Sequence, residues 1–250
     1  MQIDQYNTPP LVGPLLEATS VTAGYDDHPI LAGLNLTVSA GQIYALLGAN
    51  GAGKTTTLSL FLGFVRPDVG SVRVNGIDPV SAPDAARRQL AYIPENVAIY
   101  EHLSARENIA YLLNLAGQKE DHAAIGQALL AAGLDPVAHD RRAAGFSKGM
   151  RQKVAIALAL ARQVPVLLLD EPTSGLDPQA STEFNRLLGV LRQQGVAILM
   201  VTHDLLGVAD VVDRIGFISN GAIVEEVNAS GIERFDVRAL HRRYATQAAT

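Results

Sequence analysis

A glycine-rich turn at residues 48–55, Gly-Ala-Asn-Gly-Ala-Gly-Lys-Thr, leaves few folds open to this chain. The apolar run 42–47 before it predicts a buried parallel strand, and residues 55–62 after it predict a helix. Glycines let successive backbone N–H groups point towards an anion, and the helix N-terminus adds free N–H groups and a positive dipole end. The order of strand, turn and helix therefore predicts a phosphate-binding loop rather than a plain glycine turn.

The residues of this loop have distinct expected contacts. Lys54 supplies a full positive charge for the β- and γ-phosphates of a nucleotide, and Thr55 supplies a hydroxyl for Mg²⁺. The residues expected to contact the nucleotide are Gly48, Asn50, Gly51, Ala52, Gly53, Lys54, Thr55 and Thr56. The phosphates of a nucleotide and Mg²⁺ are therefore the expected ligands of this loop.

Composition limits the remaining classes of protein. With 250 residues, 48% of them apolar, the chain can bury a sizeable core in one α/β domain, with or without a subdomain. No apolar run reaches the ~18 residues that a membrane span needs, and residues 1–14 are expected to form a flexible leader rather than a signal peptide. We therefore expect a cytoplasmic protein. The net charge of −5 argues against nucleic acid as a partner, and the absence of cysteine excludes disulfides and cysteine-based metal sites.

Apolar runs and turn residues give a coarse order of elements along the chain. Residues 15–25 and 30–38 flank a turn composition and predict an antiparallel pair of strands. Further strands are expected at 71–74, 90–93, 166–169, 197–201, 214–219 and 222–227, and helices at 82–89 and 178–194. The last two strands flank Asn220-Gly221, which predicts a hairpin.

The region between residues 95 and 163 is rich in alanine and leucine and is predicted to be an inserted helical subdomain. Ser104 and Glu107 have the spacing of a capping box, which predicts the start of a helix. Asp135-Pro136, after Gly133, predicts the end of another helix. Residues 15–227 would then form one domain, followed by a partly helical tail at 228–250.

Two carboxylates, Asp170 and Glu171, follow the buried strand 166–169. Open parallel sheets bind their ligands at the carboxyl ends of the strands, so both side chains are expected beside the phosphate loop. Asp170 is placed to hold Mg²⁺ through its water shell, and Glu171 to orient a water and accept its proton. The predicted fold is α/β, a P-loop NTPase parallel sheet with an antiparallel β subdomain and an inserted α-helical subdomain.

The motifs together resemble those of the ATP-binding subunits of ABC transporters. Residues 146–150, Phe-Ser-Lys-Gly-Met, stand where this family has its signature, usually Leu-Ser-Gly-Gly-Gln. Residues 174–177, Ser-Gly-Leu-Asp, match the loop that couples two active sites, and His203 matches the switch histidine. Tyr25 matches the aromatic residue that stacks on adenine. Chemistry alone leaves Tyr25 as a strand aromatic and His203 as a structural histidine.

This resemblance implies that two ATPase subunits, expected to be identical chains, sandwich two ATP molecules. Ser147 and Gly149 would close on the γ-phosphate held by the other chain, whereas chemistry alone leaves Ser147 as a helix cap. His203 would contact the γ-phosphate and help to position the water. The dimer would drive a separate membrane permease from the cytoplasmic face of the membrane, expected to be a bacterial inner membrane.

Three positions depart from the common family pattern. Lys148 replaces the first glycine of the signature and Met150 its glutamine, while Glu95 stands where glutamine is more frequent. These variants resemble the group that serves ABC-2-type permeases, many of them exporters. Glutamate favours a metal more than glutamine does, so Glu95 is a third candidate Mg²⁺ ligand beside Thr55 and Asp170. The alternative is that Glu95 is a solvated loop residue.

Other P-loop classes fit the sequence less well. A soluble ABC ATPase that acts on DNA or translation is the main alternative, but such chains commonly carry two phosphate loops, long coiled coils or a cysteine hook. A small-molecule kinase would not explain residues 146–150, and the chain lacks the Asn-Lys-x-Asp tetrapeptide that reads guanine. The expected function is therefore that of a transport ATPase.

Overall fold

The computed structural model describes residues 13–25, 28–119, 121–230, 234–236 and 238–240. The expected leader lies outside these residues except at 13–14, and so does most of the expected tail. None of the described helices is both long enough and apolar enough to cross a membrane.

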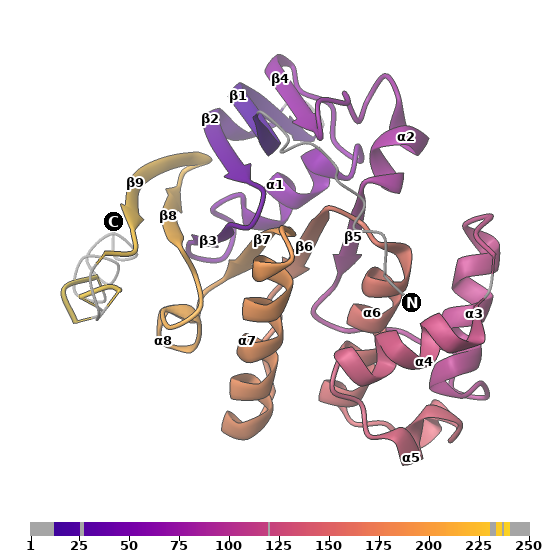
Figure 1. Cartoon of the computed structure of the whole chain (residues 1–250). Coiled ribbons are helices and arrows are strands. Elements are labelled where there is room, and N and C mark those ends of the chain that lie inside the picture. Colours follow the sequence, from indigo (N-terminus) through magenta and orange to yellow (C-terminus); the bar gives the residue numbers. More distant parts are fainter. Residues whose placement is uncertain (1–12, 26–27, 120, 231–233, 237, 241–250) are drawn as a thin grey trace.

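The larger of two sheets has six strands in the order β5-β6-β7-β3-β8-β9 (Figure 1). The first five are parallel, and β9 returns antiparallel to β8. This confirms the expected parallel core and the hairpin at Asn220-Gly221. The strands are β3 (Ile43–Leu47), β5 (Leu90–Ile93), β6 (Val166–Asp170), β7 (Ala197–Thr202), β8 (Arg214–Ser219) and β9 (Ala222–Asn228).

The smaller sheet is antiparallel, with the order β2-β1-β4. It contains β1 (Pro14–Tyr25), β2 (His28–Ser39) and β4 (Val69–Val74). In Figure 1 it lies above the larger sheet with helix α1 (Lys54–Phe61) between them. The expected antiparallel pair is therefore present, and the third strand extends it.

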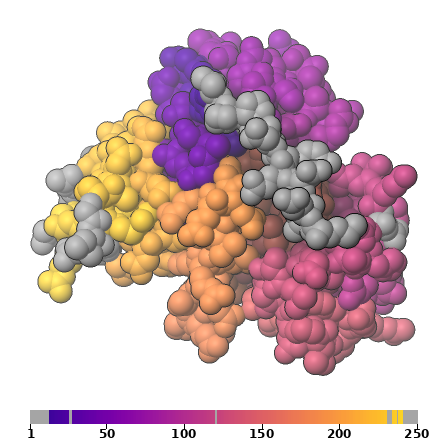
Figure 2. All heavy atoms as spheres, viewed as in Figure 1, coloured from indigo at the N-terminus to yellow at the C-terminus, as the bar shows by residue number. Residues whose placement is uncertain are grey.

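Four of the eight α-helices in the described residues form a group beyond one face of the larger sheet. This helical group contains α3 (Ala105–Leu115), α4 (His122–Ala131), α5 (Pro136–His139) and α6 (Lys148–Arg162), with a 3₁₀ turn, η1, at Ala143–Gly145. In Figure 2 its atoms gather at the lower right, away from the antiparallel sheet at the top. The remaining helices are α2 (Pro83–Arg88), α7 (Pro178–Gln193) and α8 (Leu205–Val208).

Local capping explains where two helices of this group begin. The Ser104 hydroxyl accepts from the Glu107 backbone and the Glu107 carboxylate accepts from the Ser104 backbone, which confirms the capping box at α3. The expectation for Asp135-Pro136 is wrong in one respect. Helix α4 already ends at Ala131, and the Asp135 carboxylate accepts from the Val137 N–H, so the pair begins α5.

Strand alternation divides the core between the two faces of the larger sheet. Even-numbered β3 residues, Tyr44 and Leu46, pack with the antiparallel sheet and α1. Odd-numbered residues, such as Ile43 and Leu47, pack with the helical group and α7. Because both faces are covered, β3 is buried along its whole length. The polar motifs come directly after the strands of the larger sheet, at the carboxyl ends of these strands.

Candidate functional site

A cavity of about 350 Å³ lies at the carboxyl ends of β3 and β6. Its lining includes most of the glycine-rich loop together with Glu95, Asp170 and Glu171. Of the predicted nucleotide contacts, those in the lining are Asn50, Gly51, Gly53, Lys54, Thr55 and Thr56. The fold therefore brings the loop, the carboxylates and the candidate metal ligands to one place.

The loop needs glycine for two different reasons. Gly53, the N-cap of α1, has a φ of 109°, in the region that favours glycine, and offers no side-chain cap. At Gly48 close packing leaves no room for a side chain, because a Cβ there would lie 2.6 Å from Ile218 Cγ2. The first N–H groups of α1 have no intrahelical acceptors, and no side chain covers them at the N-cap. They are available to an anion.

Lys54 folds back over its own loop. Its Nζ donates to the carbonyl of Gly48 at 2.7 Å and to that of Ala49 at 3.2 Å, and it lies 4.0 Å from Glu171 Oε1. Burial lowers the pKa of Lys54, and the carboxylates of Glu171 and Asp170 oppose that shift. The side chain is 8% exposed, and its ammonium already donates to acceptors of its own chain. An incoming phosphate would replace neutral carbonyls with a charged partner.

Glu171 and His203 meet beside this lysine. Glu171 Oε2 lies 2.9 Å from His203 Nδ1 and accepts from the Thr202 hydroxyl at 3.0 Å. The backbone of Glu171 has a φ of 43°, an uncommon left-handed conformation outside glycine. Three contacts and a strained backbone thus fix one carboxylate at the cavity, in a position from which it can orient a water.

Asp170 is held from the neighbouring strand. The Tyr92 hydroxyl of β5 donates to Asp170 Oδ2 at 3.2 Å. Burial is the main reason that the pKa of Asp170 is raised, and burial together with Asp170 raises the pKa of Tyr92 to about 12. Sequence reasoning missed Tyr92. The sequence feature that could have indicated Tyr92 was its place near the end of the predicted strand 90–93. That this strand pairs with β6 is given by the structure.

The candidate metal ligands Thr55, Glu95 and Asp170 all line the cavity and all offer oxygen. Within the described residues no three His, Asp or Glu side chains gather closely enough to hold a metal alone. Mg²⁺ is commonly bound through one or two carboxylates together with substrate phosphates, so this donor set fits Mg²⁺.

Several predicted site residues lie outside the cavity lining. Tyr25 ends β1 and is 50% exposed. The Ser147 hydroxyl accepts from the Met150 N–H and caps α6, with Gly149 in the first turn. His203 contacts Glu171, which lines the cavity.

Sequence reasoning also missed Gln152. Its side chain is fully buried and donates to the Pro172 carbonyl at 2.6 Å. This hydrogen bond joins α6 to the residue that follows Glu171. The signature helix is therefore hydrogen-bonded to the segment that carries the candidate base.

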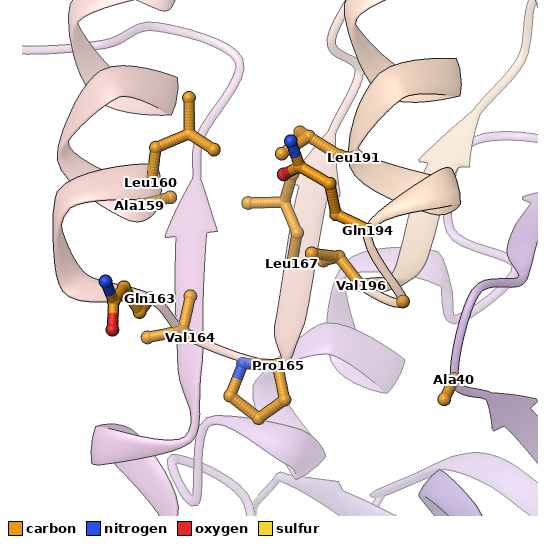
Figure 3. A pocket seen from close by; sticks show the side chains of 11 residues that line it. Ala40, Ala159, Leu160, Gln163, Val164, Pro165, Leu167, Leu191, Gln194 and Val196 are labelled. Atoms are coloured by element: carbon orange, nitrogen blue, oxygen red, sulfur yellow. The ribbon is translucent and has the colours of Figure 1, made fainter. Parts of the chain in front are cut away.

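A second cavity, of about 470 Å³, lies near the amino ends of β6 and β7. Figure 3 shows Leu160 of α6 across the cavity from Leu167 of β6 and Leu191 of α7. Its lining is mainly apolar and includes no charged side chain among the described residues. Such a cavity does not suit phosphate.

An uncapped glycine loop with its lysine after β3, and paired carboxylates at the end of β6, two strands away in the same parallel sheet, define a P-loop nucleoside triphosphatase. Residues 31–174, more than half of the chain, match the family described as ABC transporter. The chain belongs to the ABC transporter family and is an ATPase. This confirms the resemblance drawn from the motifs.

Known relatives agree with this assignment. The bacitracin transport ATP-binding protein BcrA of Bacillus licheniformis is 34% identical over 236 residues, covering 93% of this chain and 76% of that protein. The methionine import ATP-binding protein MetN of Caulobacter vibrioides is also 34% identical, covering 92% and 71%. A solved ATP-binding subunit of an ABC transporter is 30% identical with a TM-score of 0.76, covering 94% of this chain and 95% of its own.

Proposed function

We propose that two copies of this chain close around two ATP molecules and drive a separate membrane permease. The observation that carries the proposal is the position of Ser147 and Gly149. They form a helix start with the chemistry of an anion site, yet they do not line the cavity that holds the phosphate loop. A second chain would supply the missing phosphate to this helix start.

Within each site the described contacts support a division of roles. Lys54 and the loop N–H groups bind the phosphates, and Tyr25 stacks on the adenine. Glu171 orients the attacking water and accepts its proton, while His203, joined to the same carboxylate, contacts the γ-phosphate. Thr55, Glu95 and Asp170 would hold Mg²⁺, which neutralises phosphate charge when bound.

The dimer can be tested with Glu171→Gln. The amide keeps the shape of the side chain but cannot accept the proton, so we expect turnover to fall by about 10²–10⁴-fold while ATP binding persists. The variant should then elute as a dimer in size exclusion with MgATP and as a monomer without nucleotide. Lys54→Ala in the same background is the control, and should stay monomeric. A Glu171→Gln chain that turns over fully and remains monomeric would exclude both the base and the sandwich.

The surface that would receive the permease comprises the loop between β5 and α3 and part of α3 itself. Tyr100 is 40% exposed and packs edge-on against Tyr111, with ring centroids 5.0 Å apart. Val97 and Ile99, in the same loop as Tyr100, instead pack against the core, so they do not belong to this surface. Two exposed tyrosines side by side suit a partner helix with an apolar face. By resemblance the permease is of the ABC-2 type, and the chain would work at the cytoplasmic face of the inner membrane as an exporter subunit.

Charge at this surface would test the permease contact. Tyr100→Glu and Tyr111→Glu should spare ATP binding and release the permease in a detergent pull-down. Val137→Glu is the matched control, because Val137 is 81% exposed on the same helical group but distant in sequence from the tyrosines. If both tyrosine variants still co-purify with the permease, this surface is not the contact. A chain that recruits no membrane protein would instead favour the soluble ABC ATPase.

A further inference from the structure

Two positions where this chain departs from the common family pattern contact one another. Lys148 Nζ lies 3.8 Å from Glu95 Oε1, and the Ser174 hydroxyl donates to the same oxygen at 2.9 Å. Glu95 follows β5, Lys148 is the first residue of α6, and Ser174 lies in the loop after β6. One carboxylate oxygen therefore joins three segments that come from distant parts of the sequence.

The pair lies between the nucleotide cavity and the signature helix. Glu95 lines the cavity together with Asp170 and Lys54. On the side of the pair away from the cavity, the Lys148 ammonium lies against the loop after β6. It is 3.7 Å from where a Cβ on Gly175 would be. Both side chains are partly buried, 28% exposed for Lys148 and 45% for Glu95. The carboxylate thus faces a cation of its own chain on one side and the candidate metal site on the other.

This arrangement is particular to Lys148 among neighbouring cations of α6. Arg151 pairs with Glu101 at 2.9 Å, and Lys153 pairs with Glu183 at 2.9 Å. Neither acidic partner lines the nucleotide cavity. Lys148 is therefore the α6 cation whose partner borders the site.

We infer that Lys148 is a positioning residue that occupies the Glu95 carboxylate as an internal cation and competes with Mg²⁺ for it. The inference rests on the proposed role of Glu95 as a metal ligand. A carboxylate that already has a cation close to one oxygen has less charge to offer a second one, and the two cations also repel each other. Binding of the metal to Glu95 then weakens the hold on Lys148.

The consequence concerns the second anion site. Lys148 stands between Ser147 and Gly149, the two residues proposed to close on the phosphate of the other chain. Its side chain lies against Glu95 and would be released when the carboxylate turns to the metal. Binding of the metal and nucleotide in the cavity of one chain thereby changes the start of its α6, which is proposed to contact the nucleotide of the other chain.

The test is a titration with Mn²⁺, a spectroscopic substitute for Mg²⁺, in the presence of a non-hydrolysable ATP analogue. Bound Mn²⁺ is counted by electron paramagnetic resonance, so the readout does not depend on turnover. Lys148→Ala should lower the half-saturating Mn²⁺ concentration about two- to fivefold, the range expected for a partly exposed ion pair. Lys148→Met, which keeps the length of the side chain, should do the same, and Lys148→Arg should retain the wild-type value.

Two controls separate this inference from the proposed function. Lys153→Ala removes a comparable Lys–Glu pair from the same helix and should leave the Mn²⁺ midpoint unchanged. In a Glu95→Gln background, Lys148→Ala should have no further effect. If Glu95→Gln raises the midpoint but Lys148→Ala leaves it unchanged or raises it, Lys148 does not compete and the inference is overturned. If Glu95→Gln itself has no effect, the metal role of Glu95 fails, and the inference fails with it.

Discussion

The two helices that begin at the proposed anion sites start in different ways. Helix α1 begins after Gly53, which has a left-handed backbone conformation and no side chain that could cap the helix. Helix α6 begins after Ser147, whose hydroxyl accepts from the Met150 N–H. The start of α1 lies in a cavity, and the start of α6 lies outside it. One site leaves its donors for a ligand, and the other satisfies a donor within its own chain.

In the proposed dimer, this difference distinguishes a site that one chain forms by itself from a site that needs the nucleotide of a second chain. Lys54 occupies the first site by bonding to the loop carbonyls of Gly48 and Ala49, which offsets the cost of burying its charge. The start of α6 needs no buried cation with internal acceptors, because a capped helix start is stable in water. Each half of the comparison can be tested by a substitution that should affect one site and spare the other.

The largest effect is expected at Lys54. Lys54→Ala removes the charge-assisted bond to phosphate, so ATP affinity should fall by about 10- to 100-fold, as for loss of a hydrogen bond to a charged group. Ser147→Ala should leave ATP affinity of the isolated chain unchanged, because Ser147 does not line the cavity. Isothermal titration calorimetry on both variants checks this. Equal losses of affinity would mean that the two helix starts act on the same nucleotide within one chain.

The two helix-start glycines should respond in opposite ways to alanine. Gly53→Ala places a Cβ 2.7 Å from Leu31 Cδ2 at a φ of 109°, so the free energy of unfolding should fall by about 1–3 kcal/mol. At Gly149 the new Cβ would lie 3.6 Å from Leu176, an ordinary contact, and alanine favours the helix. Gly149→Ala should therefore keep or raise the stability. Urea denaturation of both variants measures the difference, and a loss at Gly149 would contradict it.

A smaller effect is expected at Ser147. Ser147→Ala removes the cap of α6 and should lower the free energy of unfolding by about 0.5–2 kcal/mol, whereas Ser147→Thr should keep most of it. If α6 is also an anion site in the dimer, both stability and turnover fall in the alanine variant, and both recover in the threonine variant. Thermal unfolding and steady-state ATPase rates check the two effects. Unchanged turnover in Ser147→Ala would confine Ser147 to capping.

The sequence predicted the parts of this molecule that depend on local pattern. The phosphate loop, the strand before Asp170 and the capping box at Ser104 each depend on residues a few positions apart. Such short-range patterns determine local structure directly, through the backbone conformations that these residues favour. The hairpin at Asn220-Gly221 is of the same kind.

Contacts between distant segments could not be predicted in this way. Tyr92 reaches Asp170 across 78 positions of sequence, and Gln152 reaches Pro172 across 20. The pair of Lys148 and Glu95 depends on how α6 lies relative to β5, which neither segment encodes alone. Asp135 shows a further limit, since Asp-Pro can follow one helix and begin the next.

Strand register has a consequence for how this chain can change. Leu47, which ends β3, pairs with Thr202 of β7, and Asp170, which ends β6, pairs with Val201 of the same strand. Backbone hydrogen bonds, rather than side chains, therefore fix the relative heights of the loop, the carboxylates and the histidine. Apolar residues within these strands can be exchanged for others of similar volume without moving the site. Deletion of one residue from β6 or β7 would shift a motif by about 3.3 Å and turn its neighbours to the opposite face. Over evolutionary time the strands should drift in sequence while their lengths stay constant.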